Sequence, residues 1–164
     1  KDFDAVIATG SNNSARHFEY YFGKYPHIIR KNRTSVAILN GKESTRELQE
    51  LGKDVFYYYG LGCRNVSKLY VPESYDFKVF FEAVFPFGYV SDNKKYFNNH
   101  EYYEYYTNQA QLVEKIKPLE ENLQCTVSNF DVNGLNTIAF GSTQEPGISD
   151  FADNVNTLDF LNTL

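Results

Sequence analysis

Short apolar runs alternate with segments of helical periodicity along most of the chain. The runs that predict strands are rich in β-branched residues and lie at 4–8, 35–39, 68–71, 125–127 and 137–140. The segments whose apolar positions recur near the helical period lie at 15–22, 44–60, 75–85 and 112–116, with a final helical or mixed segment at 149–161. Strands that alternate with helices predict an α/β fold built on a largely parallel sheet.

One helix is marked more clearly than the others. Ser44 and Glu47 have the spacing of a capping box, and Leu48 and Leu51 continue the apolar stripe of the same segment. We expect this helix to begin after Ser44 and to end at Gly60.

The composition is that of a folded domain. Of 164 residues, 42% are hydrophobic and 23% are charged, which is far from the composition of disordered chains. The formal charge of −5 argues against nonspecific binding to nucleic acid. The most apolar stretch, residues 77–90, contains Lys78, Glu82 and Pro86, so no membrane span is expected.

Two further features bear on the compartment and on completeness. The N-terminal residues show no secretory signal, and only two cysteines are present, so a reducing cytoplasm is the expected compartment. The sequence contains no methionine, and we expect it to be part of a longer protein.

Aromatic residues are abundant, with 14 Phe and 14 Tyr. Two clusters, Phe56–Tyr59 and Tyr102–Tyr106, have the density of a base-stacking surface. Because the second cluster is interleaved with Glu104 and preceded by Glu101 rather than by basic residues, we expect these side chains to pack in the core.

The two cysteines lie in different contexts. Cys63 belongs to a Gly-Leu-Gly-Cys-Arg segment after the best-marked helix, where it is either a nucleophile that Arg64 activates or a buried structural thiol. Cys125 lies within an apolar strand pattern and is predicted to be part of the core. The histidines at 17, 27 and 100 and the cysteines show no metal-ligand spacing, so no metal is predicted.

The turn Thr9-Gly10-Ser11 connects a predicted strand to a predicted helix. Backbone N–H groups and the helix dipole favour an anion such as a pyrophosphate at such a turn. The segment lacks a full G-x-G-x-x-G fingerprint, so a plain turn is the alternative reading.

Several blocks resemble the aldehyde dehydrogenase superfamily. Ala8–Ser11, Arg33–Ile38 and Gly60–Arg64 are similar in order and spacing to its F-T-G-S, G-K-S-P and G-Q-x-C blocks, and residues 139–147 are similar to its P-F-G-G-x-x-x-S-G block. Within this superfamily, residues 8–16 and 59–72 resemble acyl-CoA reductases of the bacterial LuxC type.

The resemblance implies a fold, a reaction and a division of the chain. Residues 1–30 would be the end of a Rossmann-like nucleotide-binding domain, and residues 31–164 an aldehyde-dehydrogenase-like catalytic domain. Cys63 would attack an acyl-CoA or acyl-protein thioester and hold the acyl group, and NADPH, or alternatively NADH, would reduce it to a fatty aldehyde. Thr9, Gly10 and Ser11 would lie by the cofactor phosphates, and a homo-oligomer is expected.

The sequence also departs from the superfamily. The glutamate that activates water in oxidising members corresponds to about Ile29, with His27 nearby as a proton donor or acceptor or as a plain surface histidine. A motif that normally follows is missing, so chain is expected to be absent near 100/101. A CoA-acylating aldehyde dehydrogenase and a noncatalytic α/β binding module remain the alternatives.

Overall fold

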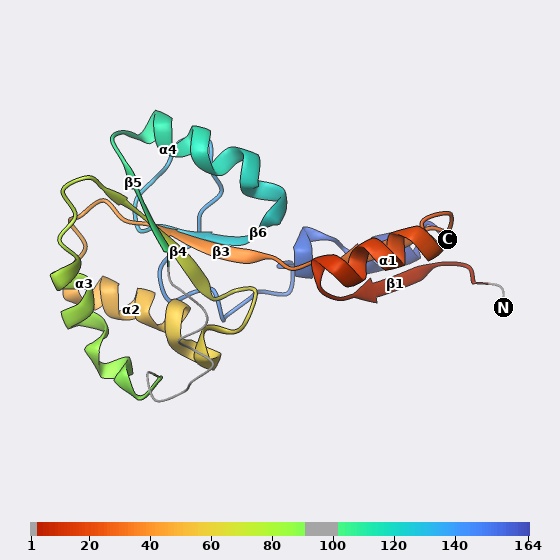
Figure 1. The fold of residues 1–164 in the computed structure, drawn as a ribbon, viewed down its shortest axis with the longest axis horizontal. Coiled ribbons are helices and arrows are strands. Elements are labelled where there is room, and N and C mark those ends of the chain that lie inside the picture. Colours follow the sequence, from red (N-terminus) through yellow and green to blue (C-terminus); the bar gives the residue numbers. More distant parts are fainter. Residues whose placement is uncertain (1–2, 91–101) are drawn as a thin grey trace. The chain divides into compact units, whose positions relative to one another are not determined.

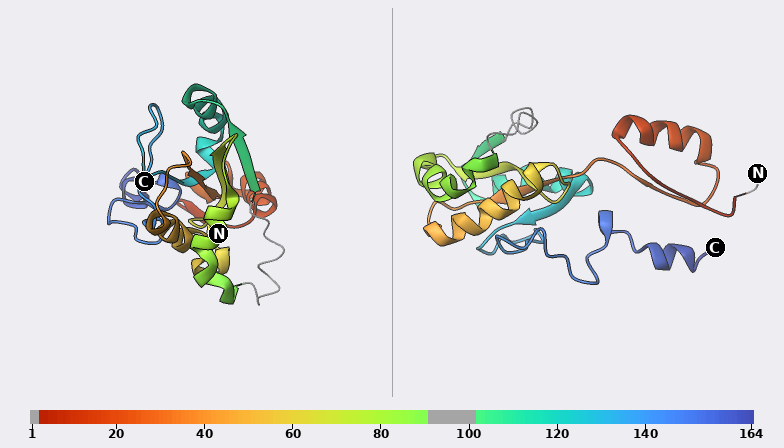
Figure 2. Two further views of the ribbon diagram at one scale, coloured as in Figure 1. Left: turned by 90° about the vertical axis from the view of Figure 1, so that its left-hand side faces the viewer. Right: turned by 90° about the horizontal axis from the view of Figure 1, so that it is seen from below.

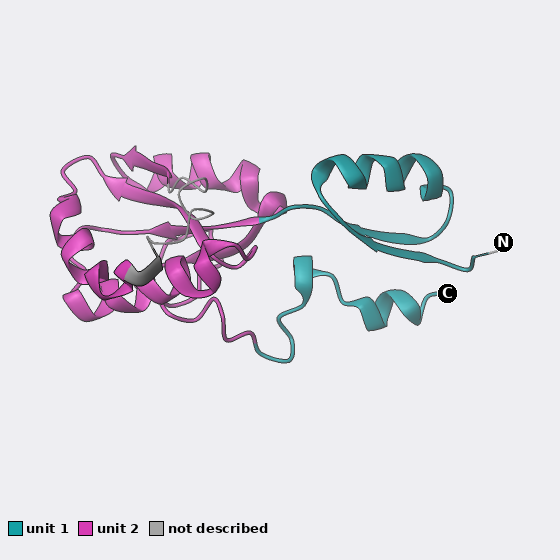
Figure 3. Ribbon diagram, turned by 60° about the horizontal axis from the view of Figure 1, so that its bottom comes forward, with its two compact units in different colours: residues 1–33, 147–164 teal, residues 34–146 magenta. Residues whose placement is uncertain are grey.

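The computed structural model describes residues 3–90 and 102–164. The chain forms two compact units, one comprising Lys1–Arg33 with Gly147–Leu164 and the other comprising Thr34–Pro146 (Figure 3). The predicted gap near 100/101 lies outside the described residues. The predicted division of the chain near Arg30 stays a prediction.

The first unit is built on a parallel β-α-β segment. Strand β1 (Val6–Thr9) pairs with β2 (His27–Arg30), and helix α1 (Asn12–Phe22) connects them (Figure 2, right). The C-terminal segment adds a short helical turn, η5 (Ala152–Asn154), and helix α5 (Thr157–Leu161). Arg30 donates from Nη2 to Thr157 Oγ1 at 2.9 Å, and Arg33 Nε lies 3.4 Å from Asp153 Oδ1, so the last residue of β2 and the residues after it contact this segment.

The second unit is a four-stranded parallel sheet with the strand order β5-β4-β3-β6. Its strands are β3 (Thr34–Ile38), β4 (Val66–Pro72), β5 (Tyr102–Tyr106) and β6 (Leu123–Val127). Its α-helices are α2 (Thr45–Phe56), α3 (Phe77–Val84) and α4 (Gln109–Ile116). Three 3₁₀ segments follow these helices: η1 (Tyr57–Gly60), η2 (Phe85–Val90) and η4 (Lys117–Asn122).

The order of the strands produces a doubly wound sheet. The chain steps from β3 to β4 to β5 with α2 and α3 on one face, then crosses through α4 on the other face to place β6 beside β3 (Figure 1). In such a sheet the chain adds strands toward one side and then, from β3, places β6 on the other side, while all strands stay parallel. The expected α/β class with parallel sheets is confirmed.

The core has two parts, one on each face of this sheet. Ala37 and Leu39 belong to the cluster that packs under α2 and α3, whereas Val36 and Ile38 belong to the cluster under α4. Successive side chains of a strand point to opposite faces, so this alternation places β3 between the two clusters. A strand covered on both faces is buried along nearly its whole length, as β3 is.

The sequence located most of these elements but missed two strands. Neither β2 nor β5 was predicted, and residues 137–140 do not form the strand that was expected there. Ile138 makes an isolated bridge with Val127, and the N–H of Phe140 donates to the Asn129 side chain at 2.9 Å.

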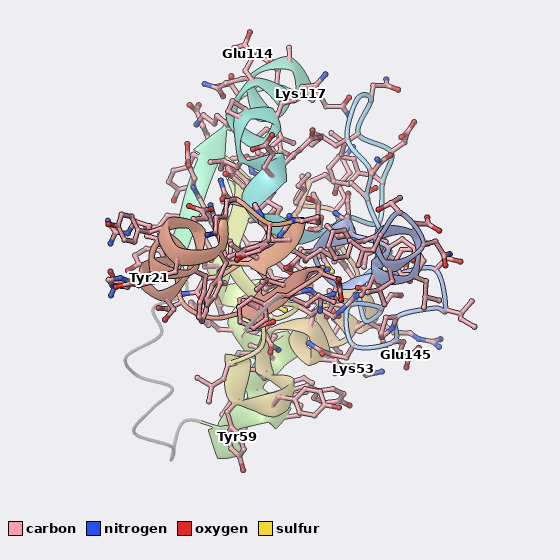
Figure 4. The ribbon with its side chains drawn as sticks, turned by 90° about the vertical axis from the view of Figure 1, so that its right-hand side faces the viewer. Tyr21, Lys53, Tyr59, Glu114, Lys117 and Glu145 are labelled. Atoms are coloured by element: carbon pink, nitrogen blue, oxygen red, sulfur yellow. The ribbon has the colours of Figure 1, made fainter. Side chains whose placement is uncertain are left out.

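The expectation that both aromatic clusters pack in the core was wrong for most of their members. Tyr58 and Tyr59 have positive φ angles of 54° and 59°, which direct them out of the helix, and Figure 4 shows Tyr59 projecting from the ribbon. In β5, an edge strand, Tyr106 is buried but Tyr102, Tyr103 and Tyr105 are exposed. Within the described ranges, no helix combines the length and apolarity that crossing a membrane requires.

Candidate active site

Cys63 lies in an exposed turn between η1 and the first residue of β4. The turn is closed by two hydrogen bonds between its ends. Asn65 N–H donates to the Gly62 carbonyl at 3.0 Å, and Gly62 N–H donates to Asn65 Oδ1 at 2.9 Å. The thiol therefore sits on the outer part of a turn whose ends are fixed.

The buried Asn65 side chain also joins this turn to the end of α2. Its Nδ2 donates to the carbonyl oxygens of Asp54 at 2.9 Å and Tyr57 at 2.8 Å. The last carbonyls of a helix have no partner within the helix, so the amide supplies the missing donors. The Cys63 turn is thus tied to the helix that precedes it.

The following η1 segment has an unusual backbone. Tyr58, Tyr59 and Gly60 all have positive φ, with values of 54°, 59° and 66°. For a residue other than glycine this conformation costs about 1–2 kcal/mol. Such strain persists only where neighbouring contacts fix the chain, and the Asn65 bonds to the helix end are contacts of this kind.

A buried hydroxyl attaches the same turn to the sheet. Ser35 Oγ donates to the Cys63 carbonyl at 2.9 Å and accepts the N–H of Cys125 at 3.1 Å. Ser35 lies at the start of β3 between β4 and β6, where the register shifts on both sides. The Cys63 carbonyl is therefore held at the amino-terminal edge of the parallel sheet.

Arg64 contacts Cys125 as well as the segment that follows β6. Its Nη1 lies 3.6 Å from Cys125 Sγ and 3.4 Å from the carbonyl oxygen of Thr143. Burial raises the pKa of the Cys125 thiol, and the Arg64 charge opposes that shift. The sequence suggested that Arg64 activates Cys63, which stays a prediction; the first of these contacts also brings the Arg64 charge to Cys125. The predicted placement of Cys125 in the core is confirmed.

Asp54 organises the segment that reaches Thr143. Its fully buried carboxylate accepts the N–H of Gly141 at 2.6 Å, the N–H of Thr143 at 3.0 Å and the Thr143 hydroxyl at 2.8 Å. Burial is the largest influence on this carboxyl and raises its pKa despite the three hydrogen bonds. Since the Asp54 carbonyl also accepts from Asn65, one residue links the Cys63 turn to the Gly141–Thr143 segment.

The surface beside this segment carries a small group of charges. Lys53 Nζ lies 2.5 Å from Glu50 Oε2, and the hydrogen bond with Glu50 is the main reason that the pKa of Lys53 is raised. The charge of Glu145 also raises the pKa of Lys53, and Figure 4 shows the Lys53 and Glu145 side chains near one another.

At the opposite, carboxyl-terminal edge of the sheet, the described residues include two glutamates that bind nearby donors of the chain. Ligands of doubly wound sheets usually bind there, where the strand order reverses. Here Glu43 accepts the N–H groups of Asn40 and Gly41, and Glu47 accepts from Ser44 and Asn129. At these positions the chain's own carboxylates therefore occupy the donors.

The turn that was predicted to bind a phosphate lies in the first unit. Thr9 ends β1, and Ser11 is the N-cap of α1, with its Oγ accepting the Ser14 N–H at 3.2 Å. A Cβ on Gly10 would lie 2.7 Å from Ser14 Cβ, so glycine is required for this close turn. The N–H of Gly10 donates to the Arg30 carbonyl at 3.2 Å, and the binding of a phosphate at this turn stays a prediction.

His27 lies at the other end of the same pair of strands. The register pairs His27 with Val6 and pairs Arg30 with Thr9, so His27 and the phosphate turn are at opposite ends. The exposed imidazole bonds from Nδ1 to the Tyr25 carbonyl at 2.8 Å. Since a carbonyl can only accept, Nδ1 carries the hydrogen of this bond, which leaves Nε2 for any other partner.

Cys63 belongs to the second unit, and His27 and Thr9–Ser11 belong to the first. Sequence reasoning missed Ser35, Asp54 and Asn65, of which Asn65 had a signal, since asparagine is common in turns. Within residues 3–90 and 102–164, no group of three or more His, Cys, Asp or Glu side chains has the arrangement of a metal site.

No family model matches the sequence, and no curated protein matches it. Among solved structures, a crystal structure of indole-3-acetaldehyde dehydrogenase in complex with NAD+ is similar, with 19% identity and a TM-score of 0.36. The match covers 51% of this chain and 18% of that chain. A likeness this low identifies neither a family nor an activity.

Proposed function

We propose that this chain is part of an enzyme that reduces a long-chain acyl-CoA, or another acyl thioester, to a fatty aldehyde with NADPH. Cys63 would carry the acyl group. The observation that carries the proposal is the construction of the Cys63 turn: the thiol is exposed, while the Cys63 carbonyl and both ends of the turn are fixed by Ser35 and Asn65. A nucleophile needs this combination of access and fixed position.

Each proposed step uses a group of this chain. The Cys63 sulfur attacks the thioester carbonyl, the carbon–sulfur bond to CoA breaks, and the acyl group stays on Cys63 as a new thioester. The backbone N–H of Cys63 would stabilise the oxyanion of that step. When bound, the nicotinamide cofactor supplies the hydride that releases the acyl group as an aldehyde.

Two other groups have proposed roles. Thr9, Gly10 and Ser11 would bind the cofactor phosphates at the N-terminus of α1, as NADPH or as NADH. His27 would hold or deliver a proton through Nε2, because Nδ1 is already bonded to Tyr25. As the resemblance implies, the full protein would act as a homo-oligomer, and a CoA-acylating aldehyde dehydrogenase would use the same nucleophile in the oxidative direction.

A noncatalytic α/β binding module is the second candidate. The observation that favours it is the exposed aromatic surface formed by Tyr57, Tyr58 and Tyr59 beside Leu61, since aromatic residues are enriched in protein interfaces. In that case Cys63 would be one exposed thiol within a contact surface.

A product assay distinguishes these functions. Full-length protein is supplied with a long-chain acyl-CoA and NADPH, and the fatty aldehyde is identified by mass spectrometry. We expect aldehyde in proportion to NADPH consumed, and none from Cys63→Ala. Aldehyde, CoA and NADP+ supplied together test the oxidative direction. A folded protein that is inactive in both directions would leave the binding module as the better account.

A further inference from the structure

The two cysteines lie on either side of one buried hydroxyl. The Cys63 carbonyl oxygen is 2.9 Å from Ser35 Oγ, and the Cys125 nitrogen is 3.1 Å from the same atom. One hydroxyl oxygen therefore contacts the backbones of both cysteines. A disulfide forms where the two Cα atoms can come within about 4.4–6.8 Å of one another.

Arg64 provides a second contact between the two sites. Its guanidinium reaches from the Cys63 turn to within 3.6 Å of Cys125 Sγ. The positive charge favours the Cys125 thiolate, against the effect of burial, and a thiolate is the form that attacks another sulfur. The turn thus contacts Cys125 both at its amide, through Ser35, and at its sulfur.

One of the two cysteines is exposed and the other is buried, so an oxidant from solvent would reach one of them first. Cys63 is exposed and accessible to small oxidants, while Cys125 is 8% exposed. Gly62 immediately precedes Cys63, and Gly60 lies two residues further back with a φ of 66°. Without side chains of their own, these glycines leave room for the Cys63 side chain to rotate, while hydrogen bonds hold the backbone of the turn.

We propose that Cys63 and Cys125 form a reversible intrachain disulfide when a hydroperoxide oxidises Cys63. The Cys63 thiolate attacks the peroxide, the O–O bond breaks, and an alcohol or water leaves while Cys63 becomes a sulfenic acid. Cys125 then attacks Cys63 Sγ, the S–O bond breaks, and the hydroxide takes up the proton of the Cys125 thiol. Two thiols and one hydroperoxide give one disulfide, one alcohol or water, and one further water.

Such a bond would protect Cys63 from irreversible oxidation. It uses the cysteine of the proposed reaction but does not depend on acyl transfer, because it is detected on the sulfur atoms themselves. A dithiol would restore Cys63 by exchange.

The test uses full-length protein treated with hydrogen peroxide and then alkylated. Trypsin cleaves after Arg64 and separates the two cysteines, so a disulfide joins two tryptic peptides that a dithiol releases. We expect this joined pair in the wild type, at a yield independent of protein concentration. In Cys125→Ser we expect dimedone to trap a Cys63 sulfenic acid, and several-fold more Cys63 to become irreversibly oxidised than in the wild type. Cys63→Ser should give neither product.

Three results would overturn the proposal. The first is that peroxide leaves both thiols reduced in folded wild-type protein. The second is that wild type and Cys125→Ser accumulate irreversibly oxidised Cys63 at the same rate. The third is that the joined peptides come from two different chains, which a covalent dimer on a non-reducing gel would show. If the protein gives any of these results but still reduces acyl-CoA to aldehyde, the disulfide proposal fails while the proposed function stands.

Discussion

Gly62 and Asn65 are joined by two hydrogen bonds that run in opposite directions, one from each backbone N–H. The second uses the Asn65 side-chain oxygen, and the nitrogen of the same amide donates to the end of α2. One buried side chain therefore closes the turn that carries Cys63 and attaches that turn to the preceding helix.

Replacing Asn65 is expected to destabilise the protein and to loosen this turn. Asn65→Ala leaves the Gly62 N–H and buried helix carbonyls without a partner, and each such group costs about 1–3 kcal/mol. Denaturant unfolding of the full-length protein measures the loss. Asn65→Asp is the matched control, because it keeps the acceptor for Gly62 but removes both donors. A loss below about 0.5 kcal/mol for Asn65→Ala would show that the amide does not hold the turn.

The two thiols should differ in their reaction with iodoacetamide. Cys63 is exposed and should be alkylated in the folded protein, whereas burial both shields Cys125 and raises its pKa. Peptide mapping at several pH values should show Cys63 modified first, with Cys125 protected until denaturant is added. Equal rates in the folded protein would contradict the described burial of Cys125.

The contribution of Asp54 to the free energy of unfolding should fall as the pH rises. Because burial raises the pKa of its carboxyl in the folded state, the folded protein binds a proton more tightly there than the unfolded chain does. The stabilising contribution is complete below the ordinary pKa of aspartate and is lost as the pH rises through the raised value.

The Asp54→Asn variant isolates this contribution. It cannot ionise at this position, so the stability of wild type relative to the variant should fall with rising pH over the same window. Unfolding measured across mildly acidic pH tests it. A relative stability that rises with pH would show that the three hydrogen bonds outweigh burial.

Glu104 is expected to contribute modestly to the attachment of β5 and α4. Its oxygens lie 2.6 Å from Lys68 Nζ and 2.7 Å from Lys115 Nζ, and these contacts lower the pKa of the carboxyl. Partly exposed ion pairs stabilise by up to about 1 kcal/mol. Glu104→Gln should lose about that much at neutral pH, and the difference from wild type should shrink as acid protonates Glu104.

Glu82→Gln is the matched control for that measurement. Glu82 pairs with Lys78 at 3.7 Å, and both side chains are largely exposed. We expect no measurable change in unfolding free energy. An equal loss in the two variants would assign the Glu104 effect to general charge rather than to its contacts.

The strongly periodic elements could be predicted from the sequence, for a local reason. The capping box of Ser44 and Glu47 forms as expected, and the helix that follows it begins at Thr45. The end of that helix differed from the expectation, because α2 stops at Phe56 and the chain continues through η1 to Gly60. What stops it is the set of Asn65 hydrogen bonds, which come from beyond the helix.

The surroundings of Cys63 could not be predicted for the same physical reason. Ser35 and Cys125 are separated by 90 residues and meet only because β3 and β6 are adjacent in the sheet. Strand order is set by long-range packing, so the partner of a buried serine is invisible in local patterns. The nucleophile itself could be proposed from the sequence, since flanking glycines and a resemblance mark it.

Trapping of the acyl group on Cys63 tests the role of this cysteine as the nucleophile. Full-length protein is mixed with radiolabelled long-chain acyl-CoA in a single turnover, and the label bound to protein is counted before and after NADPH is added. The account predicts a label that Cys125→Ser retains, Cys63→Ala lacks and NADPH discharges as aldehyde. Folded protein that takes up no label, or whose label persists in Cys63→Ala, would contradict it.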